Sequence, residues 1–173
     1  MIREYAPIPL IPAAWALTFA TLVYPGIDTY WIQHMHYFMV LFLGGFTVLS
    51  WKKMGEDSVL DIWRKIIALG TVFTGLGALS FITTDYSSIL GYLSFSYWFL
   101  APGIGLYASS RHMNNYSKLY RQLGGESVIG FVLILLGLYT DSLILQIIGI
   151  VGIAVVQTIS IVTASKLDSN DPE

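Results

Sequence analysis

The stretch SLILQIIGIVGIAVVQTISIVTAS, residues 142–165, runs for 24 residues without a single charged side chain. A helix rises about 1.5 Å per residue, so about 20 apolar residues cross the ~30 Å hydrocarbon layer of a lipid bilayer. Residues 142–165 are long enough to do so without tilting or thinning the membrane. The stretch therefore predicts a transmembrane helix and places the rest of the chain in or beside a bilayer.

Five further apolar runs precede this stretch. We expect the six transmembrane helices at about residues 7–24, 30–51, 66–83, 87–109, 121–139 and 142–165. The fifth is the weakest, because its uncharged part begins only at Ser127, and it crosses only if Arg121 and Glu126 reach water from the interface. The prediction is an all-α integral membrane protein, with six transmembrane helices in three consecutive hairpins that form a single domain over residues 1–166.

The composition excludes several other classes of protein. Only 12% of the 173 residues are charged and 55% are hydrophobic, whereas a soluble domain carries about 25% charged residues. Nine cationic and eleven acidic side chains give a net charge of −2, so no basic surface for nucleic acid is expected. The absence of cysteine excludes disulfides and thiolate metal sites.

The positions of the cationic side chains predict the orientation of the chain. They occupy the amino end, the second and fourth connections and the carboxyl end, as Arg3, Lys52, Lys53, Arg64, Lys65, Arg111, Lys118, Arg121 and Lys166. The other three connections, around Asp28, Asp85 and Asp141, contain none. Because cytoplasmic loops are enriched in Lys and Arg, we expect a multi-pass protein of the cell membrane with both termini cytoplasmic.

Two shorter segments complete the predicted organisation. Residues 56–65 mix charges with Val59, Leu60, Ile62 and Trp63, a pattern typical of a short amphipathic helix that lies on the membrane surface. Residues 167–173 are polar and form a carboxyl-terminal tail.

A binding site within the bundle is suggested by Pro102 and its surroundings. Proline has no backbone N–H, so it leaves the Trp98 carbonyl without its helical partner and bends the helix. The spans around 30–51, 66–83 and 87–109 also carry polar and aromatic side chains. The candidate ligand-binding residues are Gln33, His36, Tyr92, Ser94, Tyr97, Trp98 and Pro102. The competing interpretation is plain helix packing, since proline and small residues are common in membrane helices.

The second predicted span contains two histidines, His34 and His36. Residues two apart on a helix point about 200° away from each other, so these imidazoles cannot easily share a metal ion. The third histidine, His112, falls at the opposite end of the bundle. We therefore predict no metal site and no cofactor, and we expect one of the two histidines to face the bundle.

A polar cluster at the outer face is a second candidate site. Asp28, Asp85, Asp141 and His34 all fall near the cation-free connections, where carboxylates and an imidazole could hold a cation or exchange protons. The alternative is that each aspartate caps the helix that follows it by accepting hydrogen bonds from free backbone N–H groups.

Three functions are compatible with these observations. The first is the binding or passage of a small apolar or weakly polar ligand within the bundle. The second is an accessory or structural subunit of a larger membrane complex, or a homo-oligomer. The third, a redox or lipid-modifying enzyme that uses His34 or His36, ranks last, because the chain lacks the sequence motifs of intramembrane hydrolases and prenyl transferases. The expected partners are membrane lipid and a small ligand.

Overall fold

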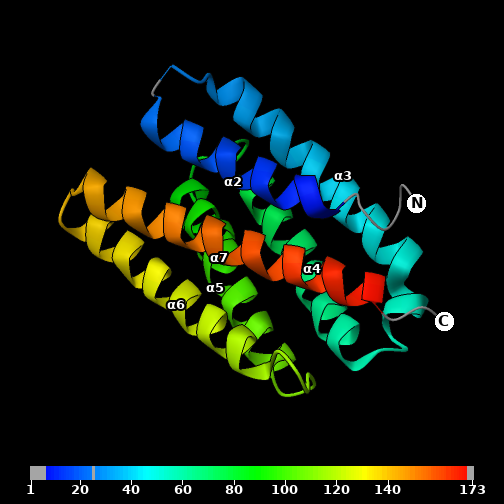
Figure 1. Cartoon of the computed structure of the whole chain (residues 1–173). Coiled ribbons are helices and arrows are strands. Elements are labelled where there is room, and N and C mark those ends of the chain that lie inside the picture. Colours follow the sequence, from blue (N-terminus) through cyan, green and yellow to red (C-terminus); the bar gives the residue numbers. More distant parts are fainter. Residues whose placement is uncertain (1–6, 25, 171–173) are drawn as a thin grey trace.

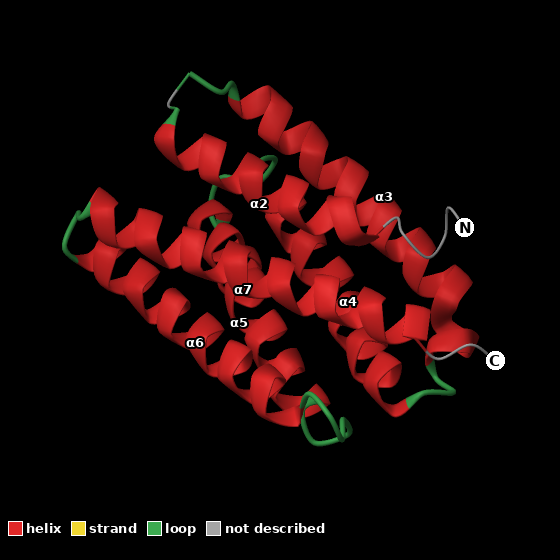
Figure 2. Ribbon diagram, viewed as in Figure 1, coloured by secondary structure: helices red, strands yellow, loops and turns green. Residues whose placement is uncertain are grey.

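The computed structural model describes the backbone of residues 7–24 and 26–170, and the side chains of residues 13–24 and 26–164. All of its regular elements are α-helices, and the described residues contain no strand (Figure 2). The helices are α2 (Pro7–Val23), α3 (Thr29–Met54), α4 (Ser58–Ser80), α5 (Ser87–Ser109), α6 (Ser117–Tyr139) and α7 (Leu143–Asn170). Five of them, α3 to α7, are long and apolar enough to cross a membrane.

The shortest helix is the first one rather than the fifth. Helix α2 has 17 residues, which span about 26 Å. Helix α6, the weakest span in the sequence, begins earlier than expected, at Ser117, and reaches 23 residues. Its charged side chains Arg121 and Glu126 are exposed on the helix surface, so they do not prevent the helix from continuing toward residue 117.

Residues 56–65 do not form the separate surface helix that was predicted. Residues 58–65 are the first turns of α4, which continues without a break to Ser80. The side chain of Asp57 starts this helix by accepting hydrogen bonds from the backbone N–H groups of Val59 and Leu60, at 2.9 and 2.8 Å. No glycine or proline follows before Gly70, so nothing separates an amphipathic first segment from the apolar segment after it.

The helices run alternately up and down the bundle. In Figure 1 the connections α2–α3, α4–α5 and α6–α7 lie at one end. The connections α3–α4 and α5–α6, the beginning of α2 and the end of α7 lie at the other end (Figure 1). The cation-bearing connections therefore share one end of the molecule, and the aspartate-bearing connections share the opposite end.

The packing order differs from three consecutive hairpins. The α4–α5 and α6–α7 hairpins pack tightly, but among the described residues α2 packs on α7, and α3 packs on α4. The predicted hairpin of the first two helices is thus wrong as a packing unit. Trp15 of α2 contacts two other helices instead. Its ring lies 5.1 Å from the Phe99 ring of α5, measured between ring centroids, and its Nε1 donates a hydrogen bond to Gln157 of α7.

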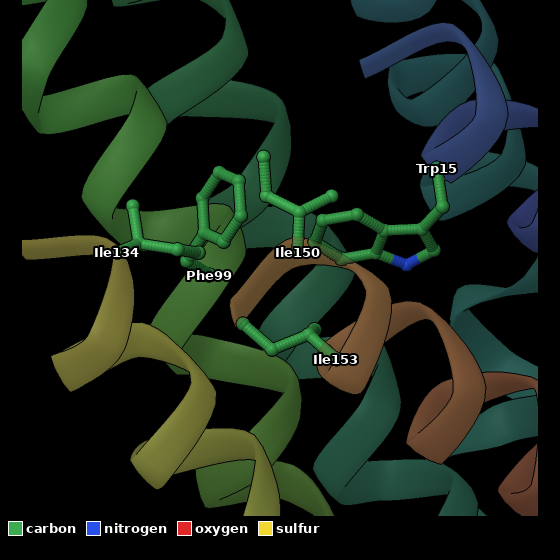
Figure 3. Close-up of a cluster of buried hydrophobic side chains, with 5 residues drawn as sticks. All are labelled: Trp15, Phe99, Ile134, Ile150 and Ile153. Carbon is green, nitrogen blue, oxygen red and sulfur yellow. The ribbon is translucent and has the colours of Figure 1, made fainter. Parts of the chain in front are cut away.

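The main apolar core joins α2, α5, α6 and α7. Figure 3 shows Trp15 reaching toward Ile150 and Ile153 of α7, with Phe99 and Ile134 on the far side. The backbones of α6 and α7 approach closely beside this core, because a Cβ atom on Gly149 would lie only 2.5 Å from the carbonyl oxygen of residue 130. Close backbone approach at small residues is the usual means of helix association in lipid.

Candidate functional site

The two histidines of α3 face different surroundings. His34 is exposed, and its ring lies 3.9 Å from the ring of Tyr30 on the same helix. His36 is half-buried and turns toward α4, where its ring meets Phe81 at 5.2 Å between centroids. The spacing of two residues along a helix therefore places only His36 toward the bundle, as the sequence indicated.

His36 and Ser94 meet over Gly77. An ideal Cβ atom built on Gly77 of α4 would lie 2.6 Å from the Ser94 Oγ of α5 and 2.9 Å from the His36 Cδ2 of α3. Helices α3 and α5 thus bring two polar side chains to one point on α4, and they can do so only because residue 77 has no side chain. We call His36, Gly77 and Ser94 the Gly77 site.

The two polar side chains of this site differ in burial, since Ser94 is 5% exposed and His36 is half-buried. Among the described residues, the buried side-chain atoms without a hydrogen-bond partner lie elsewhere, at Thr47 Oγ1, Arg64 Nε, Ser109 Oγ, Ser127 Oγ and Gln157 Nε2. Thr74 and Ser80 on α4 bond backbone carbonyls of their own helix at 2.7 Å. The His36 Nδ1 lies 2.9 Å from the Ile32 carbonyl oxygen of its own helix.

Tyr97 and Trp98 lie next to the Gly77 site, but their polar groups are already paired. The Tyr97 hydroxyl donates to the Ile66 carbonyl at 2.6 Å, and the Trp98 Nε1 donates to the Thr74 Oγ1 at 2.8 Å. The Trp98 ring covers Gly70, two turns along α4 from Gly77. The hydrogen bonds of these two aromatic residues join α5 to α4. They lie on the side of the Gly77 site that faces the start of α4 at Ser58.

The other three candidate ligand-binding residues lie elsewhere. Gln33 is bonded to the Tyr37 hydroxyl of its own helix at 2.6 Å. Tyr92 is 65% exposed and lines a different feature, an open surface groove of about 310 Å³ between α5 and α6. Pro102 is buried eight residues beyond Ser94 along α5. The structure therefore does not gather the seven predicted residues into one cavity.

Asp28 behaves as a helix cap, whereas Asp85 and Asp141 do not. Asp28 accepts a hydrogen bond from the backbone N–H of Tyr30 at 2.8 Å and so starts α3. Helix α5 begins after Tyr86 with no side-chain cap. Asp141 has a left-handed backbone with φ of 52° and follows the end of α6, so it terminates one helix instead of starting the next.

The outer-face cluster is not assembled as a metal site in this structure. Within residues 13–24 and 26–164, no three His, Asp or Glu side chains lie close enough together to hold a metal ion. His34 also points away from the bundle, with its Nδ1 at 2.7 Å from the Tyr30 carbonyl oxygen. Asp28, Asp85 and Asp141 form no such group in that part of the chain.

Two polar features of the bundle were missed by the sequence analysis. One is Gln157, 7% exposed in the middle of the most apolar stretch, which accepts a hydrogen bond from Trp15 at 2.9 Å. The signal for it was an amide within an uncharged run, which also contains Gln146. The other is Gly77, which stood among several small residues of α4 with nothing in the sequence to single it out.

Comparison of the chain with protein-family models, with curated proteins and with solved structures finds no match.

Proposed function

We propose that the chain is a multi-pass membrane protein with six spans, both termini in the cytoplasm, and the cell membrane as its location. The length and hydropathy of α3 to α7 support five crossings. The 17 residues of α2 make a sixth possible with modest thinning of the bilayer. The cation-bearing connections share one end of the bundle (Figure 1), which is the end that the positive-inside rule assigns to the cytoplasm.

We further propose that the bundle binds a small, weakly polar, lipid-soluble ligand at the Gly77 site. The observation that carries this proposal is the convergence of the Ser94 Oγ of α5 and the His36 ring of α3 on one point over Gly77 of α4. An ionisable side chain within a membrane helix marks a functional site more often than it serves packing alone. A ligand with one hydrogen-bonding group could contact both side chains.

The position of the site fits a ligand that arrives from the bilayer. Gly77 lies one turn before the end of α4 at Ser80, near the aspartate-bearing end of the bundle. His36 belongs to α3, a helix that packs on α4 in the described residues. A molecule with an apolar body can therefore place its polar group at the site while its body remains in lipid.

Filling the site with a methyl group tests the proposal. Gly77→Ala places a Cβ where the Ser94 Oγ and the His36 ring now lie, whereas a Cβ on Gly75 of the same helix meets nothing within 4 Å. The probe is hexadecan-1-ol with a photoreactive diazirine in its chain, added to protein in lipid nanodiscs. Saturable labelling near the site should fall several-fold in Gly77→Ala and persist in Gly75→Ala. Equal labelling of both variants contradicts the proposal.

An accessory role in a larger membrane complex is a second candidate, favoured by one feature of α3. This helix has 26 residues, yet Leu43 is its single buried residue among those described. Small residues such as Gly45, whose Cβ would meet nothing within 4 Å, would permit a further helix to approach. The mass of the protein purified in mild detergent tests this role. A stoichiometric second chain supports it, and a protein that purifies alone with its ligand opposes it.

A further inference from the structure

We infer that the protein forms a parallel dimer through the outward face of α6, in which Arg121 of each copy pairs with Glu126 of the other copy. Helix α6 lies at an edge of the bundle (Figure 1), where it packs on α5 and α7. The face of α6 that points away from these two helices is exposed. The inference goes beyond the ligand site at Gly77 and does not depend on it.

The exposed face of α6 has a seven-residue repeat. Its positions follow one another in steps of three and four residues and are Gln122, Gly125, Ile129, Val132 and Leu136, all of them exposed. We call these five residues the α6 seam. The buried residues lie on the other side of the helix and are Tyr120, Leu123, Gly124, Ser127, Gly130, Ile134 and Gly137. Steps of three and four residues are the spacing with which one helix packs along another in a coiled coil, so the α6 seam fits a second helix.

Glu126, beside the α6 seam, is poorly accommodated by lipid alone. Helix α6 has 23 residues and is about 35 Å long, so it fills the ~30 Å hydrocarbon layer from end to end. Glu126 then lies about 10 Å inside that layer, and its side chain is exposed on the outside of the bundle. Ionisable groups at membrane depth nearly always face a polar cavity or a partner group. The exposure of Glu126 therefore indicates that another chain covers it.

Arg121 has the charge that complements a carboxylate, but it cannot meet Glu126 within one copy. The two residues are five positions apart, and side chains on a helix meet when they are three or four positions apart. Neither takes part in an ion pair within the described residues, where the ion pairs are those of Asp61 with Arg64 and Lys65. Arg121 and Glu126 flank the α6 seam on opposite edges, about 140° apart around the helix axis.

A second copy in the same orientation brings these two side chains together. In a parallel pair of helices with a seven-residue repeat, the residue just before one seam position pairs with the residue five positions farther along the partner helix. Arg121 and Glu126 have this spacing, and twofold symmetry produces the pair twice. Copies that follow the positive-inside rule all have the same orientation in the membrane, so a parallel arrangement is available to them.

The centre of the α6 seam allows a close approach of the two copies. A Cβ atom on Gly125 would meet nothing within 4 Å, so the backbone of a second helix can approach at this position. Gln122, one turn earlier, would face Gln122 of the second copy, where two amides can hydrogen-bond to each other. Ile129 and Val132, which are 61% and 46% exposed, would pack against the same residues of the second copy.

Disulfide cross-linking in native membranes tests this interface, because the chain has no cysteine of its own. Val132→Cys puts a thiol on the α6 seam. The matched control is Val151→Cys on α7, since the two valines are about equally exposed, at 46% and 45%, and lie at a similar distance from the aspartate-bearing end of the bundle. With copper phenanthroline as the oxidant, Val132→Cys should form a covalent dimer several-fold faster than Val151→Cys.

Reversal of the charges tests the pair of residues. In the Val132→Cys background, Arg121→Glu and Glu126→Arg should each slow cross-linking several-fold, because each change brings like charges together. The variant with both changes has opposite charges in exchanged positions, so its cross-linking should return close to the starting rate. This recovery also shows that chains with the reversed charges fold and insert. Glu126→Gln, a milder change, should slow cross-linking less than Glu126→Arg.

Three outcomes would overturn the inference. Equal rates for Val132→Cys and Val151→Cys would mean that the copies meet only by random collision. The absence of a covalent dimer from Val132→Cys would mean that lipid or a different chain covers the α6 seam. Cross-linking that Arg121→Glu and Glu126→Arg slow separately, and that the double change does not restore, would contradict the pairing of these two residues.

Discussion

The indole Nε1 of Trp15 donates a hydrogen bond to the Gln157 Oε1 over 2.9 Å, joining helices that are 142 residues apart in the chain. Both side chains are buried, at 9% and 7% exposure. The Gln157 Nε2 is also buried and has no acceptor among the described residues. This bond joins α2, the shortest helix, to α7, and it adds to the apolar contacts that α2 makes with the core.

Trp15→Phe should destabilise the protein more than Gln157→Leu does. The first change leaves an entire buried amide without a partner, whereas the second leaves one indole N–H; an unpaired buried group costs about 1–3 kcal/mol. The double variant should lose less stability than the sum of the two single variants, because it removes both polar groups together. Unfolding in a denaturing detergent titration measures these free energies, and strict additivity would contradict the coupling.

Gly149→Ala should weaken the contact between α6 and α7. Its Cβ would lie 2.5 Å from a backbone oxygen at residue 130, which cannot move aside as a flexible side chain could. Overpacking of this kind costs about 1–3 kcal/mol. The matched control is Gly152→Ala on the same helix, whose Cβ meets nothing within 4 Å and which should be neutral or stabilising by up to about 1 kcal/mol. Similar unfolding midpoints for the two variants would argue against close backbone packing.

Asp28→Ala and Asp85→Ala should differ although both remove an outer aspartate. Asp28 caps α3 through the Tyr30 N–H, and loss of such a cap costs about 1 kcal/mol. Asp85 makes only a long contact of 3.4 Å with the neighbouring Thr84 hydroxyl, so its loss should be close to neutral. The same detergent titration distinguishes them. A joint site of the outer aspartates would instead make the two variants behave alike in a cation-binding assay.

The membrane orientation can be mapped cleanly, because the natural chain contains no cysteine. Asp85→Cys lies in the α4–α5 connection, and Asn114→Cys lies in the α5–α6 connection at the opposite end of the bundle (Figure 1). A membrane-impermeant maleimide added to intact cells should label the first variant and reach the second only after lysis. The reverse pattern would invert the proposed topology.

Much of the fold could be predicted from apolar run length. The run at 87–109 coincides with α5, because Ser87 and Ser109 bound an uncharged stretch of helical length. Helix packing was harder to predict, since run length says nothing about which neighbour a helix meets. The placement of α2 on α7 brings together Trp15 and Gln157, which are 142 residues apart in the chain.

The candidate site was predictable only in part, for a similar reason. Helical spacing separated His36 from His34, and both His36 and Ser94 were among the expected ligand-binding residues. Their convergence on Gly77 depends on how α3 and α5 cross α4, which no local pattern encodes. Gln33 lies on the same helix as His36, and Tyr92 and Pro102 lie on the same helix as Ser94. Their surroundings differ, because Gln33 bonds within α3, Tyr92 is exposed and Pro102 is buried farther along α5.

The most direct test of the Gly77 site is the amount of lipid-soluble ligand that stays bound to the protein purified from its own membrane. Native mass spectrometry of the wild type, Gly77→Ala and Gly75→Ala gives this amount per chain. We expect a bound neutral molecule on the wild type and on Gly75→Ala, and its loss from Gly77→Ala. The same bound mass on all three proteins, or on none of them, would contradict this expectation.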